Sequence, residues 1–196
     1  MLPTVDPALE VGAYPADLAR EVTCRDGSRV RLRPIRPDDA PRLQAMHARF
    51  SRETVYQRFF GATPQLATRW ARFLAEVDYR RRLALVLERG SDADPELIGV
   101  GRYEPTAEPD TAEVAFVVDD RWQGKGLGTI LFTALLAAAH DRGIRRFRAD
   151  VLAYNRRMLD LITRFARVDR RETRDAITSL VFSFRPGRPA PRAKGA

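Results

Sequence analysis

The sequence is poor in the residues that characterise secreted, metal-binding and membrane proteins. It has one cysteine, Cys24, so it cannot form an intramolecular disulfide, which fits a reducing cytoplasm. Its two histidines, His47 and His140, stand alone, and no cysteine–histidine cluster has metal-ligand spacing. No apolar run approaches the roughly 20 residues that span a bilayer, and nothing at the N-terminus resembles a signal peptide. We therefore expect a cytoplasmic protein with no metal site and no membrane segment, in which both histidines are structural.

Lysine is also scarce. Only Lys125 and Lys194 occur among the 34 lysines and arginines, and the formal net charge is +8. An excess of basic residues favours acidic partners such as nucleic acids, CoA phosphates or acidic proteins. The arginines are spread along the whole chain, often with acids nearby, and cluster only briefly at 80–82, at 145–148 and in the tail. That distribution argues against nucleic-acid binding as the main role.

The length and the apolar patterns predict one domain. A chain of 196 residues can bury a substantial core. Residues 1–20 are punctuated by prolines and predict an arm with a short helix at about 16–21. Residues 21–185 carry the alternating and helical patterns of the folded domain. Residues 186–196 form a proline-rich basic tail that we expect to be disordered.

Within the domain, the patterns predict an α+β fold with a mixed sheet. Asp38 or Asp39 can cap the first helix and Ser51 the second, while Gly61 and Gly143 are expected to end helices. The strands before and after the longest helix should be parallel, because strand–helix–strand crossovers are right-handed. The expected elements are a hairpin over 21–34, helices over 38–50, 51–61 and 63–77, an antiparallel meander of strands over 82–88, 96–103 and 111–118, a helix over 126–142, a strand over 146–153, a helix over 155–166 and a hairpin over 167–184.

The stretch 114–132 organises the chain. A buried strand leads into a turn with Gly124, Gly126 and Gly128, and the turn opens an amphipathic helix. Glycine lets a backbone approach a ligand closely. The first amides of a helix have no intrahelical partner and carry partial positive charge. The stretch therefore predicts a backbone cradle for a phosphate or pyrophosphate.

Two common phosphate motifs do not fit this turn. A P-loop needs serine or threonine after its lysine and a glycine five residues before the second one, but Gly126 follows Lys125 and position 119 is not glycine. A dinucleotide fingerprint needs Gly-x-Gly-x-x-Gly, whereas the spacing here is Gly-x-Gly-x-Gly. Asp150 lies at about the distance of the ribose-binding acid, but too little chain follows for a doubly wound sheet.

The stretch Gln123-Gly-Lys-Gly-Leu-Gly128 resembles the Gln/Arg-x-x-Gly-x-Gly/Ala signature of GNAT N-acetyltransferases. Asn155 lies in a second, weaker family motif, and the element order over 30–184 is also the family order. Leu32-Arg-Pro-Ile-Arg-Pro-Asp-Asp-Ala and Arg58-Phe-Phe-Gly resemble bacterial protein-lysine acetyltransferases. In some of those, the GNAT domain is fused to a cyclic-nucleotide-binding or acyl-CoA-synthetase-like domain, for which we expect no room here.

The resemblance implies a GNAT fold, in which a twisted, mostly antiparallel sheet flanked by helices splays open at the acyl-CoA site. Acetyl-CoA would be the co-substrate. Whether the chain forms a homodimer stays open. The side chains of Arg121 and Lys125 could reach a phosphate or remain solvated. The implied CoA-binding residues are Phe116, Val117, Val118, Gln123, Gly124, Lys125, Gly126, Leu127, Gly128, Thr129 and Asn155.

The expected reaction is acetyl transfer to a primary amine, with a protein lysine as the favoured acceptor. Glu113, just before the CoA-binding strand segment, is the candidate general base, as in the similar bacterial acetyltransferases. The alternative bases are Glu104, Glu108 and Asp110, and Glu113 could instead form a salt bridge. The tyrosine that usually acts as general acid is replaced by Ile162, so no dedicated acid is expected. Two other functions stay open, a small-amine N-acetyltransferase and a non-catalytic acyl-CoA-binding module.

Overall fold

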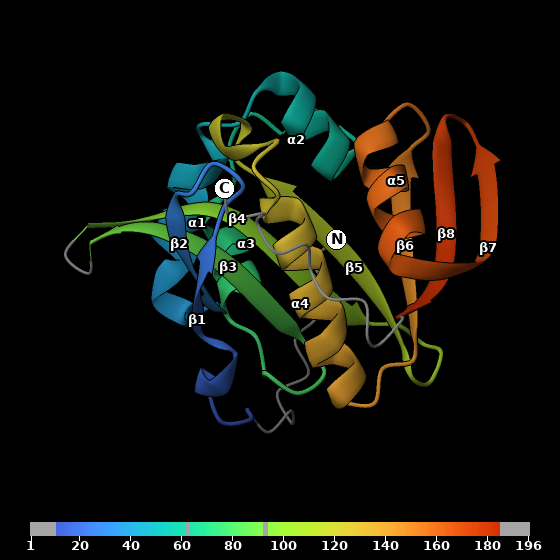
Figure 1. The fold of residues 1–196 in the computed structure, drawn as a ribbon, viewed down its shortest axis with the longest axis horizontal. Coiled ribbons are helices and arrows are strands. Elements are labelled where there is room, and N and C mark those ends of the chain that lie inside the picture. Colours follow the sequence, from blue (N-terminus) through green and yellow to red (C-terminus); the bar gives the residue numbers. More distant parts are fainter. Residues whose placement is uncertain (1–10, 62, 92–93, 185–196) are drawn as a thin grey trace.

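The computed structural model describes residues 11–184 except 62, 92 and 93 (Figure 1). Half of the predicted arm and the whole predicted tail lie outside these residues. Eight strands form one sheet in the order β1-β2-β3-β4-β5-β6-β8-β7. The strands are β1 (Arg20–Thr23), β2 (Arg29–Pro34), β3 (Leu83–Ser91), β4 (Asp94–Pro105), β5 (Thr111–Val118), β6 (Arg146–Leu152), β7 (Ala166–Arg174) and β8 (Ile177–Phe184).

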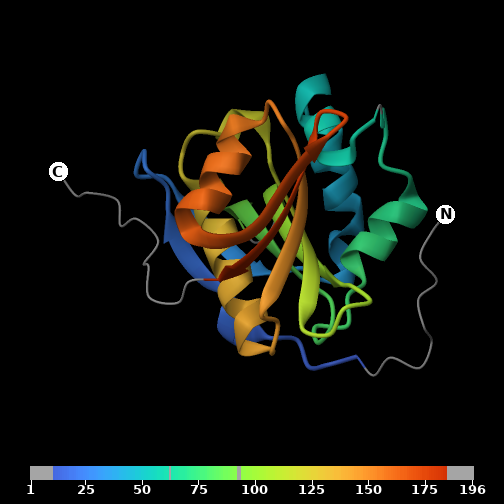
Figure 2. The ribbon, with the colours of Figure 1, turned by 90° about the vertical axis from the view of Figure 1, so that its right-hand side faces the viewer.

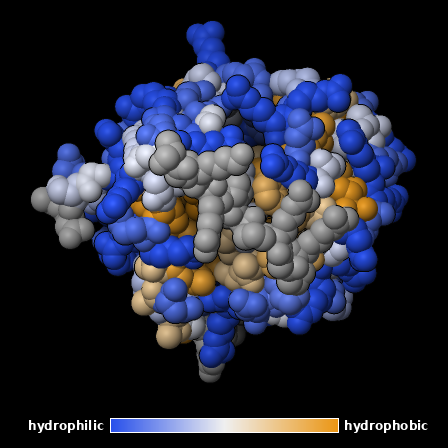
Figure 3. All heavy atoms as spheres, viewed as in Figure 1, coloured by the Kyte–Doolittle hydropathy of each residue, from blue (hydrophilic) through white to orange (hydrophobic). Residues whose placement is uncertain are grey.

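Helices flank a sheet in which, among the described strands, only the β5–β6 pair is parallel, so the predicted α+β class is confirmed. Figures 1 and 2 show α4 and α5 on one face, and α1 and α3 on the other. The helices are α1 (Ala40–His47), α2 (Arg52–Phe59), α3 (Thr68–Ala75), α4 (Leu127–Asp141) and α5 (Arg156–Phe165), with short 3-10 turns η1 (Ala16–Leu18), η2 (Pro37–Asp39) and η3 (Asp120–Trp122). None of the helices in the described ranges is long and apolar enough to cross a membrane, and the face in Figure 3 is largely hydrophilic.

Local signals explain two of the helix ends. The Ser51 hydroxyl accepts a hydrogen bond from the Thr54 amide at 3.1 Å and caps α2 as predicted. Gly143 ends α4 with a φ of 89°. The predicted end of α2 at Gly61 is wrong, because the helix ends at Phe59 and Phe60 adopts the left-handed conformation.

Three other predicted details are wrong. Asp39 does not cap α1, because its carboxylate forms a two-pronged pair with the buried Arg33 at 2.7 and 2.8 Å. A buried arginine needs such a partner, and this need outweighs the cap. The third helix begins at Thr68 rather than Thr63. The helix expected at 16–21 is a 3-10 turn, because Arg20 already pairs with β2.

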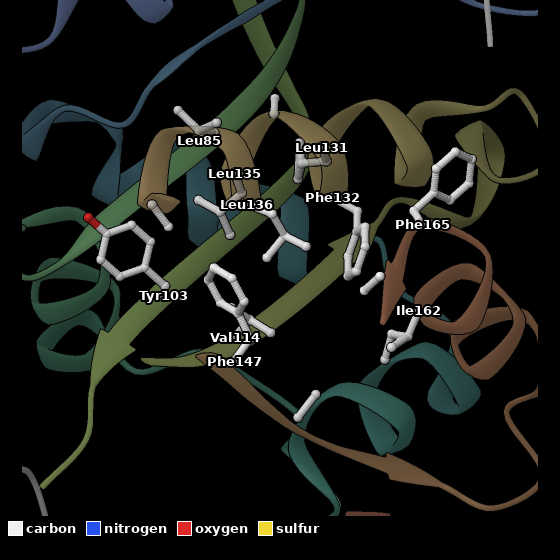
Figure 4. Close-up of a cluster of buried hydrophobic side chains, with 14 of the residues drawn as sticks. Leu85, Tyr103, Val114, Leu131, Phe132, Leu135, Leu136, Phe147, Ile162 and Phe165 are labelled. Atoms are coloured by element: carbon white, nitrogen blue, oxygen red, sulfur yellow. The ribbon is translucent and has the colours of Figure 1, made fainter. Parts of the chain in front are cut away.

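The sheet splays between β5 and β6, and this positions the functional site. The two strands are parallel, as predicted, but they pair only from Thr111–Arg146 to Glu113–Arg148. Beyond Glu113 they diverge. The interface of the sheet with α4 carries the larger core, in which Phe132 and Phe147 pack beside Val114 (Figure 4). That core holds β5 and β6 together at one end and leaves the other end open.

Candidate active site

A cavity of about 310 Å³ lies between the diverging ends of β5 and β6. Segments far apart in the sequence line it: the β1–β2 turn, α2, β5, the loop of residues 123–128 (the glycine loop), β6 and α5. Ten of the twelve residues predicted for the site are on its wall, namely Glu113, Phe116, Val117, Val118, Gln123, Gly124, Gly126, Gly128, Thr129 and Asn155.

The glycine loop presents a backbone surface to this cavity. Gly124 and Gly126 have φ values of 80° and 87°, in the region that favours glycine. A Cβ atom placed on Gly124 or Gly128 would meet no heavy atom within 4 Å, so the loop faces open space. The amides of Leu127 and Gly128, the first two of α4, precede any intrahelical acceptor. The positive end of a 15-residue helix dipole therefore points at the cavity, and the loop fits a pyrophosphate.

Three predicted side chains point elsewhere. The Lys125 ammonium lies 2.8 Å from the Asp26 carboxylate and 4.3 Å from the Trp122 ring centroid. Leu127 is buried in the core. Arg121 pairs with the carboxylates of Asp119 and Glu96 at 2.9 Å each. For Lys125 and Leu127, the backbone amides are therefore the groups left for the predicted phosphate contact.

Beyond Glu113, the β6 side of β5 forms no strand pairing, whereas its other side pairs with β4 as far as Val118. Backbone groups on that open edge can bond an extended ligand. Across the gap, the side-chain oxygen of Asn155 caps α5 by accepting a hydrogen bond from the Met158 backbone amide at 3.2 Å. The Asn155 amide group donates to Gln57 at 3.1 Å. An amide group has two hydrogens, so one remains for a ligand.

Helix α2 forms one wall of the first cavity, a position that we did not predict from the sequence. Its Thr54, Gln57 and Arg58 line the cavity. The helix is tied to the turn before the glycine loop, because Asp120 accepts from the Ser51 hydroxyl at 2.8 Å and the Thr54 hydroxyl at 2.7 Å. Burial alone would raise the pKa of Asp120, but these hydrogen bonds hold it below its usual value.

The only sequence signal that linked α2 to the site was the Arg58-Phe-Phe-Gly resemblance. Arg58 is partly buried, and its guanidinium carbon lies 5.1 Å from the Phe59 ring centroid. Burial and the charge of Arg102 lower its pKa to about 10, against the opposing influence of Glu113 and Glu104. Arg58 therefore stays charged at neutral pH and places a cation on the wall that faces Glu113.

Glu113 is exposed, and within the described ranges its carboxylate has no hydrogen bond or ion pair. The alternative bases are all paired. Glu104 bonds Arg82 at 2.6 Å and Arg102 at 2.5 Å. Glu108 pairs with Arg148, and Asp110 with Arg146. Of the four candidates, Glu113 has the carboxylate that is free to accept a proton.

A second cavity of about 350 Å³ is lined by β6, β7 and β8. It opens on the face of these strands that no helix of the described ranges covers (Figure 2). Its charged lining is Glu113, Arg148, Asp150, Arg170 and Glu172. It shares Glu113, Ala149 and Asp150 with the first cavity. Glu113 therefore stands where the two cavities meet.

No tyrosine of the described residues lines the first cavity, whereas the buried Ile162 does. Tyr154 is 51% exposed, and Tyr103 is buried and donates to the Arg80 carbonyl at 3.1 Å. Burial raises the pKa of Tyr103 to about 12. In the same part of the chain, no group of three or more His, Cys, Asp or Glu side chains could hold a metal ion.

Comparisons with known proteins agree with this geometry. Residues 29–165 match the family model of the acetyltransferase (GNAT) domain. The chain is 37% identical over 156 residues to acetyltransferase Pat of Mycolicibacterium smegmatis, covering 77% of this chain and 45% of that relative. It is 30% identical over 151 residues to acetyltransferase PA5475 of Pseudomonas aeruginosa, covering 77% of this chain and 81% of that relative.

Solved structures are similar too. The GNAT domain of S. lividans PAT superposes with a TM-score of 0.78 at 35% identity, covering 87% of this chain and 99% of that one. A cAMP-binding acyltransferase from Mycobacterium smegmatis has a TM-score of 0.60 at 28% identity, covering 89% of this chain and 49% of that one. The chain thus spans about half the length of the two mycobacterial proteins.

Proposed function

The chain belongs to the GNAT acetyltransferase family, and we propose that it transfers the acetyl group of acetyl-CoA to a lysine side chain of a protein. In this proposal Glu113 is the general base. One observation carries it: the unpaired Glu113 carboxylate lies at the junction of two cavities. One cavity holds the glycine loop and the open edge of β5, and the other opens on the uncovered sheet face.

Acetyl-CoA is the co-substrate of this family, and the first cavity is its proposed site. The amides at the start of α4 would hold the pyrophosphate, and the edge of β5 from Phe116 to Val118 would bond the pantetheine. The open space next to Gly124 and Gly128 supports this assignment. A ligand that extends from the glycine loop along β5 brings its far end toward Glu113, where the two strands separate.

The second cavity is the proposed route of the lysine. Its positive charges are neutralised by neighbours, since Arg148 pairs with Glu108 and Arg170 with Glu172. Glu113 and Asp150 have no ion pair within the described ranges, and Asp150 accepts only from the Ser179 hydroxyl at 2.6 Å. Two carboxylates that form no ion pair favour the approach of an ammonium group.

The proposed chemistry follows from these positions. Glu113 takes a proton from the lysine ammonium, directly or through a water, and the free amine attacks the thioester carbonyl carbon. The nitrogen–carbon bond forms and the carbon–sulfur bond breaks, while the nitrogen loses its second proton to solvent. The sulfur departs as a thiolate, a fair leaving group, which needs no acid at the position of Ile162.

A protein acceptor is supported by the surface around the cleft. Four large hydrophobic side chains are exposed in the described part of the chain, and three of them belong to segments next to the first cavity. Tyr56 (46%) lies on α2, Phe60 (39%) follows α2, and Tyr154 (51%) precedes Asn155. Tyr56 and Tyr154 lie close enough to influence each other electrostatically. Exposed aromatic side chains are typical of protein-binding surfaces.

The proposal is tested by mass spectrometry of proteins after incubation of the purified chain with acetyl-CoA and a cell extract. Acetylated lysines should appear with the wild type and be strongly reduced with Glu113→Gln. Acetylation of spermidine or other small amines, with no modified protein, would favour the small-amine alternative. Release of no CoA with any protein, peptide or amine would refute the enzymatic proposal.

A non-catalytic acyl-CoA-binding module is the second candidate, because no tyrosine of the described residues lines the first cavity. It predicts acetyl-CoA binding without turnover. In that case the wild type and Glu113→Gln would bind acetyl-CoA equally and release no CoA. Calorimetric binding measured beside the turnover assay therefore separates the two functions.

A further inference from the structure

We propose that Arg25, in the turn between β1 and β2, binds a phosphate group of CoA and so completes the phosphate site from the N-terminal hairpin. This role rests on the proposed function for the identity of the ligand. Arg25 lies about a hundred residues before the glycine loop, yet it lines the same cavity. No sequence motif connects the two segments.

The hairpin turn is bound to the glycine loop by two contacts. The Arg25 amide donates to the Lys125 carbonyl at 2.9 Å. The Asp26 carboxylate lies 2.8 Å from the Lys125 ammonium. Asp26 is itself held by the Ser28 hydroxyl at 2.6 Å, and hydrogen bonds from Lys125 and Ser28 lower its pKa. These contacts fix the turn beside the loop before any ligand arrives.

The Arg25 side chain extends over Gly126. A Cβ atom placed on Gly126 would lie 3.2 Å from the Cγ and 3.3 Å from the Nε of Arg25, so the glycine leaves room for the arginine stem. Arg25 is exposed, and within the described ranges its guanidinium has no ion pair. Lys125 is already neutralised by Asp26. Arg25 is thus a cation beside this loop that has no ion pair in the described ranges; Arg157, which also lines the cavity, donates to the Gln123 side-chain oxygen at 3.2 Å.

Electrostatics points to an anion between Arg25 and α4. The N-terminus of α4 carries partial positive charge, so a cation beside it is repelled unless an anion lies between them. The guanidinium also has the fork geometry that binds phosphate oxygens with two parallel hydrogen bonds. Both features match the pyrophosphate or the 3′-phosphate of CoA, and no carboxylate of the chain occupies that position in the described ranges.

The test is isothermal titration calorimetry of the full chain with acetyl-CoA and with its 3′-dephospho analogue. Arg25→Ala should weaken acetyl-CoA binding about 10- to 100-fold, the range for hydrogen bonds to charged groups. Arg29→Ala is the matched control, because Arg29 is exposed on the same hairpin and lies outside the cavity. Its affinity should stay within about twofold of the wild type.

The dephospho analogue identifies the phosphate. If Arg25 binds the 3′-phosphate, the penalty of Arg25→Ala disappears with the analogue, and if it binds the pyrophosphate, the penalty remains. Arg25→Lys keeps the charge and should recover part of the affinity. The role is overturned if Arg25→Ala and Arg29→Ala bind acetyl-CoA with equal affinity. It is also overturned if Arg25→Lys and Arg25→Ala lose affinity equally and both have a lowered Tm. Failure of the wild type to bind acetyl-CoA would instead overturn the proposed function as well.

Discussion

Replacing Glu113 by glutamine is the sharpest test of the proposed chemistry. Glutamine has nearly the shape of glutamate, but its amide cannot accept the proton of an ammonium group. The Glu113 side chain is exposed and makes no hydrogen bond or ion pair in the described ranges. The substitution therefore removes the proposed base while leaving the packing of β5 unchanged.

The structure sets the expected sizes of the effects of Glu113→Gln on stability and on turnover. A surface substitution without lost contacts changes the free energy of unfolding by no more than about 0.5 kcal/mol. Loss of a general base lowers turnover by about 10²- to 10⁴-fold. Glu113 is open to water, which can partly take over proton removal, so we expect about 10²-fold, or about 2.7 kcal/mol in the activation barrier. The barrier should therefore change about five times more than the stability.

The assay follows CoA release with a thiol reagent, beside calorimetric titration of acetyl-CoA and thermal unfolding. Glu21→Gln is the matched control, since Glu21 is an exposed acid of β1 that lies outside both cavities. Only Glu113→Gln should lose turnover, with acetyl-CoA affinity within about twofold of the wild type. The reasoning is refuted if both variants turn over alike, or if Glu113→Gln loses affinity in proportion to rate.

Other substitutions probe the cradle, the core and the acceptor surface. Gly126→Glu should abolish acetyl-CoA binding in calorimetry, because a side chain at a φ of 87° is strained and its charge repels phosphate. Asp39→Asn should lower the free energy of unfolding in urea by about 1.5–3 kcal/mol, since it removes one of the two carboxylates, Asp39 and Glu88, that pair with the buried Arg33; a change under 1 kcal/mol would contradict that account. Tyr56→Ser combined with Tyr154→Ser should lower kcat/KM for a protein acceptor but leave a short lysine peptide unaffected, and equal effects on both acceptors would argue against a docking surface.

Much of the fold could be predicted because its signals are local. The serine before α2 and the glycine after α4 act through neighbouring amides and carbonyls. Apolar spacing predicted the meander, and the strand–helix–strand order predicted the parallel pair. The prediction failed at Asp39 because a buried partner outweighed the local preference. It failed at Gly61 because Phe60, one residue earlier, adopts the left-handed conformation that ends the helix.

The glycine loop and Glu113 could likewise be found in the sequence, since a phosphate cradle depends on consecutive amides and the candidate base adjoins the same strand. The residues that form the other walls of the cavity could not be found in the sequence. Gln57 meets Asn155, and Thr54 meets Gln123, only because the sheet brings α2 beside the glycine loop and α5. These contacts cross 98 and 69 positions of sequence, and no local pattern encodes them.

The sequence by itself determined the family, the expected co-substrate site and the most plausible base, because each depends on residues that are close together in the chain. Tertiary structure alone decided which carboxylate is unpaired, that Glu113 lies between two cavities, and that Arg25 reaches the glycine loop. The physical reason is that charge pairing and cavity shape depend on distances in space, which the divergence of β5 from β6 sets.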